Sequence, residues 1–222
     1  MKHFYFDIET IPAQDPAVKA EIAAGIQAPA QYKKPESINA WLEENREAET
    51  EAAWLKTSFD GGVGQVVCIG FAIGDGQAHS YSVDDLSRDA ERKVLQDFFC
   101  AVLDAGHCTF VGHNLIGFDL PFVWKRCMVL GIKPPVTFPR SPKPWSELVQ
   151  DTMLLWDSAQ RAGGSMDRLC RLLGIPGKGD ISGADVWPLV QAGKLEEVAA
   201  YCRADVERTR SLFHRMTFAD AA

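Results

Sequence analysis

The sequence has no run of the roughly 18 apolar residues that a membrane-spanning helix needs, so it predicts no membrane span. Acidic residues appear as early as Asp7 with no apolar leader before them, and we therefore expect a protein that is not secreted. Its six cysteines are scattered and form no Cys-x-x-Cys pair, which argues against a zinc site or a disulfide framework. Reduced cysteines are typical of a cytoplasmic protein, and we expect that location.

Positive charge is also scarce, with 23 Lys and Arg against 30 Asp and Glu and a formal net charge of −7. This balance argues against a tight binder of long nucleic-acid duplexes. An enzyme that holds a few nucleotides at the end of a strand remains compatible with it. A length of 222 residues, of which 46% are hydrophobic, predicts a single domain over 1–222.

The first third of the chain predicts strands separated by an insertion. Dense apolar runs at 2–8 and 66–73 are typical of buried strands, and Gly74-Asp75-Gly76 predicts a hairpin into a strand at 77–83. Between the first two strands, residues 15–58 are rich in Ala, Glu and Lys. We expect this stretch to form a helical insertion.

Strands and helices alternate in the rest of the chain, which favours an α/β fold with a mixed sheet covered by helices. Strands are expected at 109–112 and 149–155. Five prolines predict an extended loop over 134–144. The expected helices are 84–105, a helix ending near 130, 166–173, 184–191 and 195–216.

Asp7 and Glu9 are two acids within the first strand. Alternate side chains of a strand leave the same face, about 7 Å apart. Two acids on one face of a buried strand repel each other and lose hydration. Such a pair is usually retained only where a cation offsets its charge.

Further acids stand at the beginning of one helix and inside the last one. Tyr201 and Asp205 are separated by four residues, so they share a helix face at the edge of the apolar stripe. Taken alone, they are better explained as a surface tyrosine and a surface acid. Asp119 begins a helix, where the helix dipole favours an acid anyway. His113 and Asn114 end a strand, a position that often carries ligands in α/β sheets, although a structural hydrogen bond also explains His113.

Together, Asp7, Glu9, Asp119 and Asp205 supply four carboxylates from three separate segments. Oxygen ligands suit Mg²⁺ or Mn²⁺ and do not suit zinc. Two such ions about 3.5–4 Å apart stabilise the attacking and leaving oxygens in phosphodiester hydrolysis. Tyr201 would then orient the attacking water.

These residues form three motifs, F-D-I-E-T, H-N-x3-F-D-x-P and Y-x3-D. The pattern resembles the DEDD 3′–5′ exonucleases of the tyrosine-bearing subclass (DEDDy), and most closely the stand-alone exonucleases similar to the proofreading domain of family-B DNA polymerases. The resemblance implies a ribonuclease-H-like α/β fold with a five-stranded mixed sheet. It implies that Asp7, Glu9, Asp119 and Asp205 bind two Mg²⁺ or Mn²⁺ ions and that Tyr201 contacts the water. It also implies substrate contacts around the motifs, from Ile8, Thr10, His113, Asn114, Phe118 and Lys178.

The expected activity is hydrolysis from the 3′ end of single-stranded or frayed DNA, as in repair or proofreading. An RNA exonuclease of the same fold and a nucleic-acid-binding module without robust activity are the alternatives. A glycosidase using Asp7 and Glu9 is excluded, because glycosidase acids flank the scissile bond. The sequence leaves a polymerase or repair partner and the oligomeric state open.

Basic and aromatic residues near the motifs are candidates for further contacts with nucleic acid. Each has a simpler explanation as a surface charge or a core ring. They are Lys125, Arg126, Arg140 and Lys143 for phosphates and Trp124 and Trp145 for stacking on bases.

Overall fold

The computed structural model describes residues 2–158, 164–177, 179 and 181–219. Five strands form one sheet in the order β3-β2-β1-β4-β5. β1 pairs antiparallel with β2 and parallel with β4, so the sheet is mixed, as expected. The strands are β1 (His3–Ile11), β2 (Gln65–Ile73), β3 (His79–Ser82), β4 (Thr109–Gly112) and β5 (Val149–Asp151).

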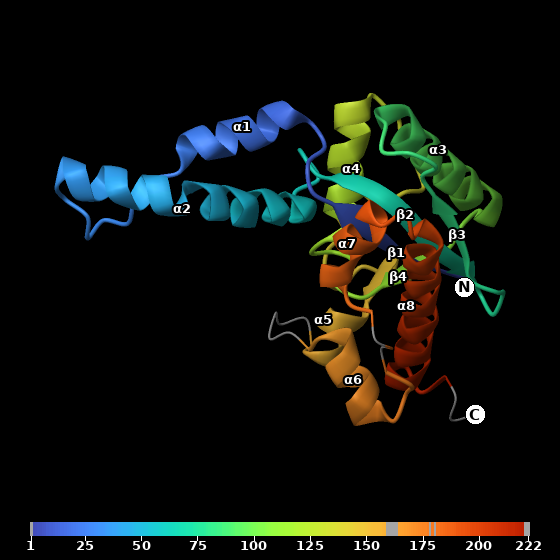
Figure 1. The fold of residues 1–222 in the computed structure, drawn as a ribbon. Helices are drawn as coiled ribbons and strands as arrows, with labels where there is room; N and C mark the ends of the chain where they lie inside the picture. Colours follow the sequence, from blue (N-terminus) through green and yellow to red (C-terminus); the bar gives the residue numbers. More distant parts are fainter. Residues whose placement is uncertain (1, 159–163, 178, 180, 220–222) are drawn as a thin grey trace.

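Helices flank the sheet, with α3 and α4 packed against β2 and with α8 lying across β1 and β2 (Figure 1). The α-helices are α1 (Pro16–Gly25), α2 (Pro35–Leu55), α3 (Arg88–Ala105), α4 (Asp119–Leu130), α5 (Thr152–Trp156), α6 (Met166–Leu173), α7 (Val186–Gln191) and α8 (Leu195–Met216). Two short 3₁₀ helices are η1 (Lys56–Phe59) and η2 (Gly183–Asp185). Within the described residues, no helix has the length and apolarity needed to cross a membrane.

The alternation of side chains along β1 decides which residues face α8. The Phe4 and Phe6 rings lie 5.9 and 5.3 Å from the ring of Phe98 in α3. Tyr5 points the other way, and its ring lies 6.1 Å from Phe213 in α8. Because successive strand residues point to opposite faces, Asp7 follows Tyr5 on the α8 face. Asp7 and Glu9 of β1 therefore face α8, the helix that carries the third motif.

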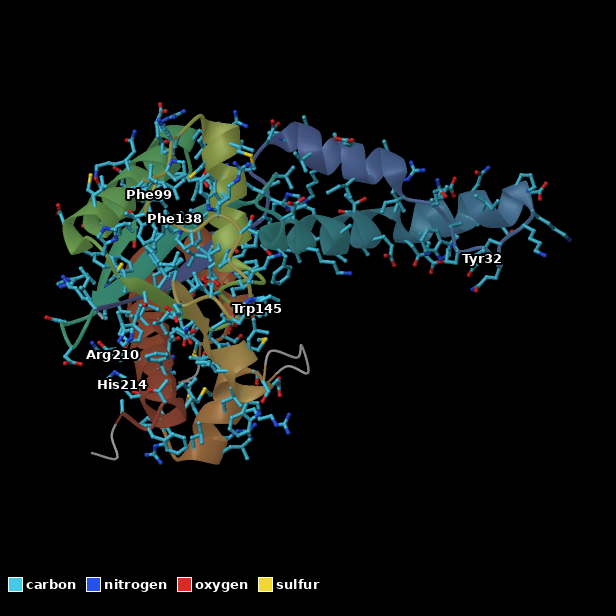
Figure 2. All side chains as sticks on the ribbon, turned by 180° about the vertical axis from the view of Figure 1, so that it is seen from behind. Tyr32, Phe99, Phe138, Trp145, Arg210 and His214 are labelled. Carbon is cyan, nitrogen blue, oxygen red and sulfur yellow. The ribbon has the colours of Figure 1, made fainter. Side chains whose placement is uncertain are left out.

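The helical insertion after the first strand is confirmed. α1 and α2 pack against each other and project away from the sheet, with Tyr32 near the far end (Figures 1 and 2). The base of this arm is fixed to the end of β1 by two hydrogen bonds. The Trp54 indole Nε1 donates to the Ala13 carbonyl at 2.8 Å, and the Ala13 N–H donates to the Thr57 hydroxyl at 2.8 Å.

Several elements are shorter than the sequence predicted, and in two of them the cause is plain. The last strand ends at Asp151 and not at 155, because the Asp151 side chain accepts the Met153 N–H and caps α5. The helix expected from residue 84 begins at Arg88, because the Ser87 hydroxyl accepts the Ala90 N–H at 3.1 Å. In both cases a local side-chain cap sets the boundary.

Candidate active site

Asp7 and Glu9 lie in the second half of β1, where the pairing with β2 changes register between Glu9 and Thr10. One carboxylate oxygen of each acid and the Cys202 sulfur all lie within 4.8 Å of one another. Asp7 is half-buried and Glu9 is 7% exposed. The two acids of the first motif thus converge on one point beside α8.

Asp119, the first residue of α4, is joined directly to this strand. Its Oδ1 accepts the Ile8 N–H at 3.1 Å, and the residue is 3% exposed. Burial, followed by the negative charge of Asp7, raises the pKa of the Asp119 carboxyl well above its usual range. The second motif therefore faces the first closely enough for the two carboxylates to repel each other.

Tyr201 and Asp205 in α8 are buried, at 7% and 4% exposed. Glycine in β2 allows the helix to approach so closely, because a Cβ on Gly70 would lie 3.0 Å from the Cys202 sulfur. Burial, followed by the charges of Asp205 and Glu9, raises the pKa of Tyr201. The phenol is therefore neutral and donates a hydrogen bond to Asp205.

Two residues that the sequence did not single out contact these carboxylates. Arg208 forms an ion pair with Asp205 and donates from Nε to the Gly177 carbonyl at 3.3 Å. The Cys202 thiol accepts the Gly70 N–H at 3.1 Å and lies 3.7 Å from Oδ2 of Asp7. Only the three-residue spacing from Asp205 to Arg208 could have indicated the ion pair.

The loop between β4 and α4 is organised by Asp151, which the sequence did not identify as a site residue. Its carboxylate is 4% exposed and accepts the N–H groups of Asn114 and Ile116, both at 2.9 Å. Asn114 adopts a left-handed backbone with φ of 58°. The His113 ring lies at the same junction, with Nδ1 2.9 Å from the Thr152 hydroxyl.

The predicted substrate-binding residues fall into different settings. The Ile8 side chain is 4% exposed and packs in the core, so its backbone N–H is the part that faces the site. The Thr10 hydroxyl donates to the Ser58 carbonyl at 2.7 Å. Phe118 is half-buried in the loop before Asp119. Lys178 lies outside the described residues.

Arg126 is neither the candidate phosphate contact nor the surface charge that the sequence suggested. Its guanidinium is buried and donates to both carboxylate oxygens of Glu91 at 2.7 Å. Glu91 also accepts the Val66 N–H at 2.9 Å, so the pair ties α3, α4 and β2 together. Lys125 is exposed and pairs with Asp60 at 2.7 Å. Neither cation was distinguishable from a surface charge by sequence spacing.

The donor set at the site is suited to a divalent cation. Asp7 and Glu9 offer carboxylate oxygens side by side, and Asp119 lies near Asp7. Asp205 pairs with Arg208, and neither Asp119 nor Asp205 belongs to the group of possible ligand atoms that lie within 4.8 Å of one another. Hard oxygen donors of this kind fit Mg²⁺ or Mn²⁺. Burial raises the pKa of the Cys202 thiol, which keeps the sulfur protonated and makes it a poor ligand.

The chain matches a family model described as a predicted 3′–5′ exonuclease related to the exonuclease domain of PolB, over residues 53–222. The chain belongs to this family. The matched residues include the second and third motifs, whereas the first motif with Asp7 and Glu9 precedes them. The comparison with curated proteins gave no match.

Among solved structures, the fold of this PolB-related exonuclease is similar to that of the family B DNA polymerase from the hyperthermophilic archaeon Pyrobaculum calidifontis. The TM-score is 0.64 with 18% sequence identity over 98% of this chain. The chain spans about a quarter of the polymerase, 24% of its length. This likeness extends across β1 and establishes the ribonuclease-H-like fold expected from the motifs.

Proposed function

We propose that the protein is a metal-dependent 3′–5′ exonuclease that removes nucleotides from single-stranded or frayed DNA. The single observation that carries this proposal is the Asp7–Glu9 carboxylate pair of a PolB-related exonuclease, with Asp119 hydrogen-bonded to the same strand and Tyr201 under the charge of both acids. We propose the four carboxylates as ligands of two Mg²⁺ or Mn²⁺ ions. When bound there, such ions would acidify a water and offset charge on the leaving 3′-oxygen.

The residues around the carboxylates have separate parts in this proposal. Tyr201, which is neutral and hydrogen-bonded to Asp205, orients the attacking water and does not remove its proton. Ile8 contributes its backbone N–H, which fixes Asp119. We propose His113, Asn114, Phe118 and Thr10 as contacts of the terminal nucleotide. Lys178 is proposed as a phosphate contact.

One assay tests the activity. Single-stranded DNA, single-stranded RNA and mismatched duplex DNA, each labelled at the 5′ end, are incubated with Mg²⁺, with Mn²⁺ and with EDTA. We expect a ladder of products shortened one nucleotide at a time from single-stranded and mismatched DNA with either metal, and none in EDTA. Faster loss of RNA than of DNA would replace the DNA assignment with the RNA exonuclease alternative.

Two controls separate exonuclease activity from its alternatives. A blocked 3′-hydroxyl should stop degradation, since the site is proposed to accept a free 3′ end; internal cuts would instead indicate an endonuclease. Asp7→Asn removes one proposed ligand charge with little change of shape, and we expect no products from this variant. Retained activity in that variant would refute the ligand assignment.

A further inference from the structure

The charge balance of the chain reverses in the segment between α4 and β5. Residues 131–148 contain Lys133, Arg140 and Lys143 against one acid, Glu147, whereas the whole chain has 23 basic and 30 acidic residues. Five prolines occupy the same segment. Because proline fixes the backbone φ angle, this surface is held in shape before any ligand arrives.

Two adjoining hollows form on this segment. The larger, about 630 Å³, is lined by apolar side chains together with the basic side chains of His107, Lys133 and Arg140. The smaller, about 380 Å³, shares Arg140 and adds Lys143 and Trp145. No acidic side chain of the described residues lines either hollow. We call the two hollows together the 131–148 surface.

The cations of the 131–148 surface differ from many other cations of the protein in their lack of a carboxylate partner among the described residues. Several cations elsewhere, buried and exposed, are paired with carboxylates, as in Arg126–Glu91, Arg203–Glu196 and Lys125–Asp60. Within the part of the chain that the structure describes, the three cations of 131–148 have no such carboxylate partner. In a protein of net charge −7, an unneutralised cluster of this kind is complementary to a polyanion.

Aromatic side chains lie among these cations. The Arg140 guanidinium lies over the Trp124 ring, 5.3 Å from its centroid, and Trp124 donates from Nε1 to the Pro139 carbonyl at 2.7 Å. Trp145 is 76% exposed. In Figure 2, Phe138 of the same segment lies beside Phe99, whereas Trp145 lies clear of that cluster. Phe138 therefore anchors the segment, and Trp145 remains free to contact a ligand.

Cations beside an exposed aromatic ring are the chemistry that holds single-stranded nucleic acid, through phosphate contacts and base stacking. The bases of a duplex are stacked on each other and present no free face to Trp145. The surface also lies at the opposite end of β4 from the loop carrying Asn114, because Gly106–Cys108 line it and immediately precede this strand. β4 has four residues, which corresponds to roughly 13 Å.

We propose that the 131–148 surface is a second binding site for single-stranded nucleic acid, which holds the strand several nucleotides away from its 3′ end. The proposal rests on the proposed function, in which that end enters the carboxylate site. It predicts that long strands bind more tightly than strands too short to reach both places.

Binding in EDTA tests the surface separately from catalysis. The anisotropy of fluorescein-labelled oligothymidines of 4 and 16 nucleotides is titrated with the wild-type protein and with the triple variant Lys133→Ala/Arg140→Ala/Lys143→Ala. The matched control is Lys33→Ala/Lys34→Ala/Arg46→Ala on the projecting arm, which changes the net charge equally. Trp145→Ala removes an exposed ring and serves as a variant with little influence on folding. Thermal melts compare the folding of all four proteins.

We expect the triple variant to bind the 16-mer at least tenfold more weakly and the 4-mer as the wild type does. Loss of three phosphate contacts should also reduce the slope of log K against log salt by about 2. Trp145→Ala should weaken binding of the 16-mer roughly tenfold, because it removes one stacking contact. Hydrolysis of the 4-mer with Mg²⁺ should be unchanged in both variants.

Three outcomes would overturn the proposal: equal effects of the triple variant and its charge-matched control, no effect of Trp145→Ala, or a wild-type protein that binds the 16-mer no more tightly than the 4-mer. Failure of the proposed function has a different signature. In that case the wild type hydrolyses neither oligonucleotide, while the length-dependent binding in EDTA still reports on the surface.

Discussion

The Asp119 carboxylate accepts the backbone N–H of Ile8 at 3.1 Å, so the second motif is hydrogen-bonded to the strand that carries the first. This bond holds Asp119 close to Asp7, whose charge contributes to the raised pKa of Asp119. The geometry places a repulsive pair of acids in a buried setting. The electrostatic cost of that pair is measurable in the protein without metal.

Asp119→Asn should abolish hydrolysis yet stabilise the metal-free protein at pH 8. The raised pKa means that the folded state holds the proton more tightly than the unfolded state. The stabilisation from protonated Asp119 is therefore present below the unfolded pKa near 3.9 and lost as pH rises through the folded pKa. Asparagine escapes this loss and can still accept the Ile8 N–H.

The measurement for this variant is the melting temperature in EDTA between pH 4 and pH 8. A gain of about 2–4 °C per kcal/mol is expected for a domain of this size, and the gain should shrink toward pH 4. A variant that melts below the wild type at pH 8 would contradict the assigned repulsion.

Asp205→Asn should have the opposite effect on stability, because Asp205 is paired with Arg208. The side chains of Asp205 and Arg208 are 5% and 14% exposed, so the substitution leaves a largely buried guanidinium without its carboxylate. Breaking a buried pair costs about 3–5 kcal/mol. In urea unfolding, the double variant Asp205→Asn/Arg208→Met should regain much of this loss. Equal stability of the single and double variants would show that the pair is not coupled.

Tyr201→Phe should lower the rate of hydrolysis by on the order of 10²-fold, because it removes a hydrogen bond to the water without removing a charge. Calorimetric binding of Mn²⁺ should be retained. Since the raised pKa keeps the phenol neutral, the pH–rate profiles of variant and wild type should have the same shape. Tyr81→Phe, on β3 away from the site, is the matched control. A change of rate at alkaline pH that is present in the wild-type profile and absent from the variant would show that Tyr201 removes the proton from the water.

Asp151→Asn should slow hydrolysis by about 10–100-fold through a displaced loop, because small errors in position are costly in catalysis. An asparagine has one acceptor oxygen where the carboxylate serves Asn114, Ile116 and Met153. Hydrogen exchange of the Asn114 and Ile116 amides should accelerate. Asp15→Asn makes the same substitution at the cap of α1, where a single N–H is accepted, and should leave activity unchanged. Unaltered exchange in Asp151→Asn would remove the positional explanation.

Tyr5, which lies away from the proposed metal ligands, should make the free energy of unfolding decrease at alkaline pH. Its hydroxyl lies 3.1 Å from Nε2 of His214, and the Arg210 guanidinium lies 6.0 Å from the centroid of its ring. Arg210 and His214 lie near each other on α8 (Figure 2). Burial raises the pKa of Tyr5 to about 12. The folded state therefore retains the proton, and this stabilisation is present below pH 10 and lost as pH rises through about 12.

Tyr5→Phe carries no ionisable phenol and should not show that loss. Urea unfolding at pH 9 and pH 11.5 should reveal a smaller decrease for the variant than for the wild type. Absorbance at 295 nm follows the ionisation itself. Parallel decreases in the two proteins would refute the raised pKa.

Local patterns were sufficient for much of the fold. The 195–216 periodicity predicted α8 to the residue, and the apolar runs predicted the strands of the mixed sheet. Boundaries set by a single side chain, such as the end of β5 at Asp151, were missed because a cap depends on one hydrogen bond and not on periodicity. The arm formed by α1 and α2 was predicted as helical, but its projection away from the sheet was not predicted. That projection follows from α1 and α2 packing against each other, which the helical pattern does not reveal.

The sequence alone determined which residue types recur at which spacing, and hence the acids, the tyrosine and the expected family. Only the tertiary structure decided which charges are free to act. The sequence does not distinguish Arg126 and Arg208 from Arg140. In the structure, Arg126 and Arg208 are paired with buried carboxylates, whereas Arg140 lies over the Trp124 ring. Burial and partners arise from contacts between distant segments, which spacing along the chain does not encode.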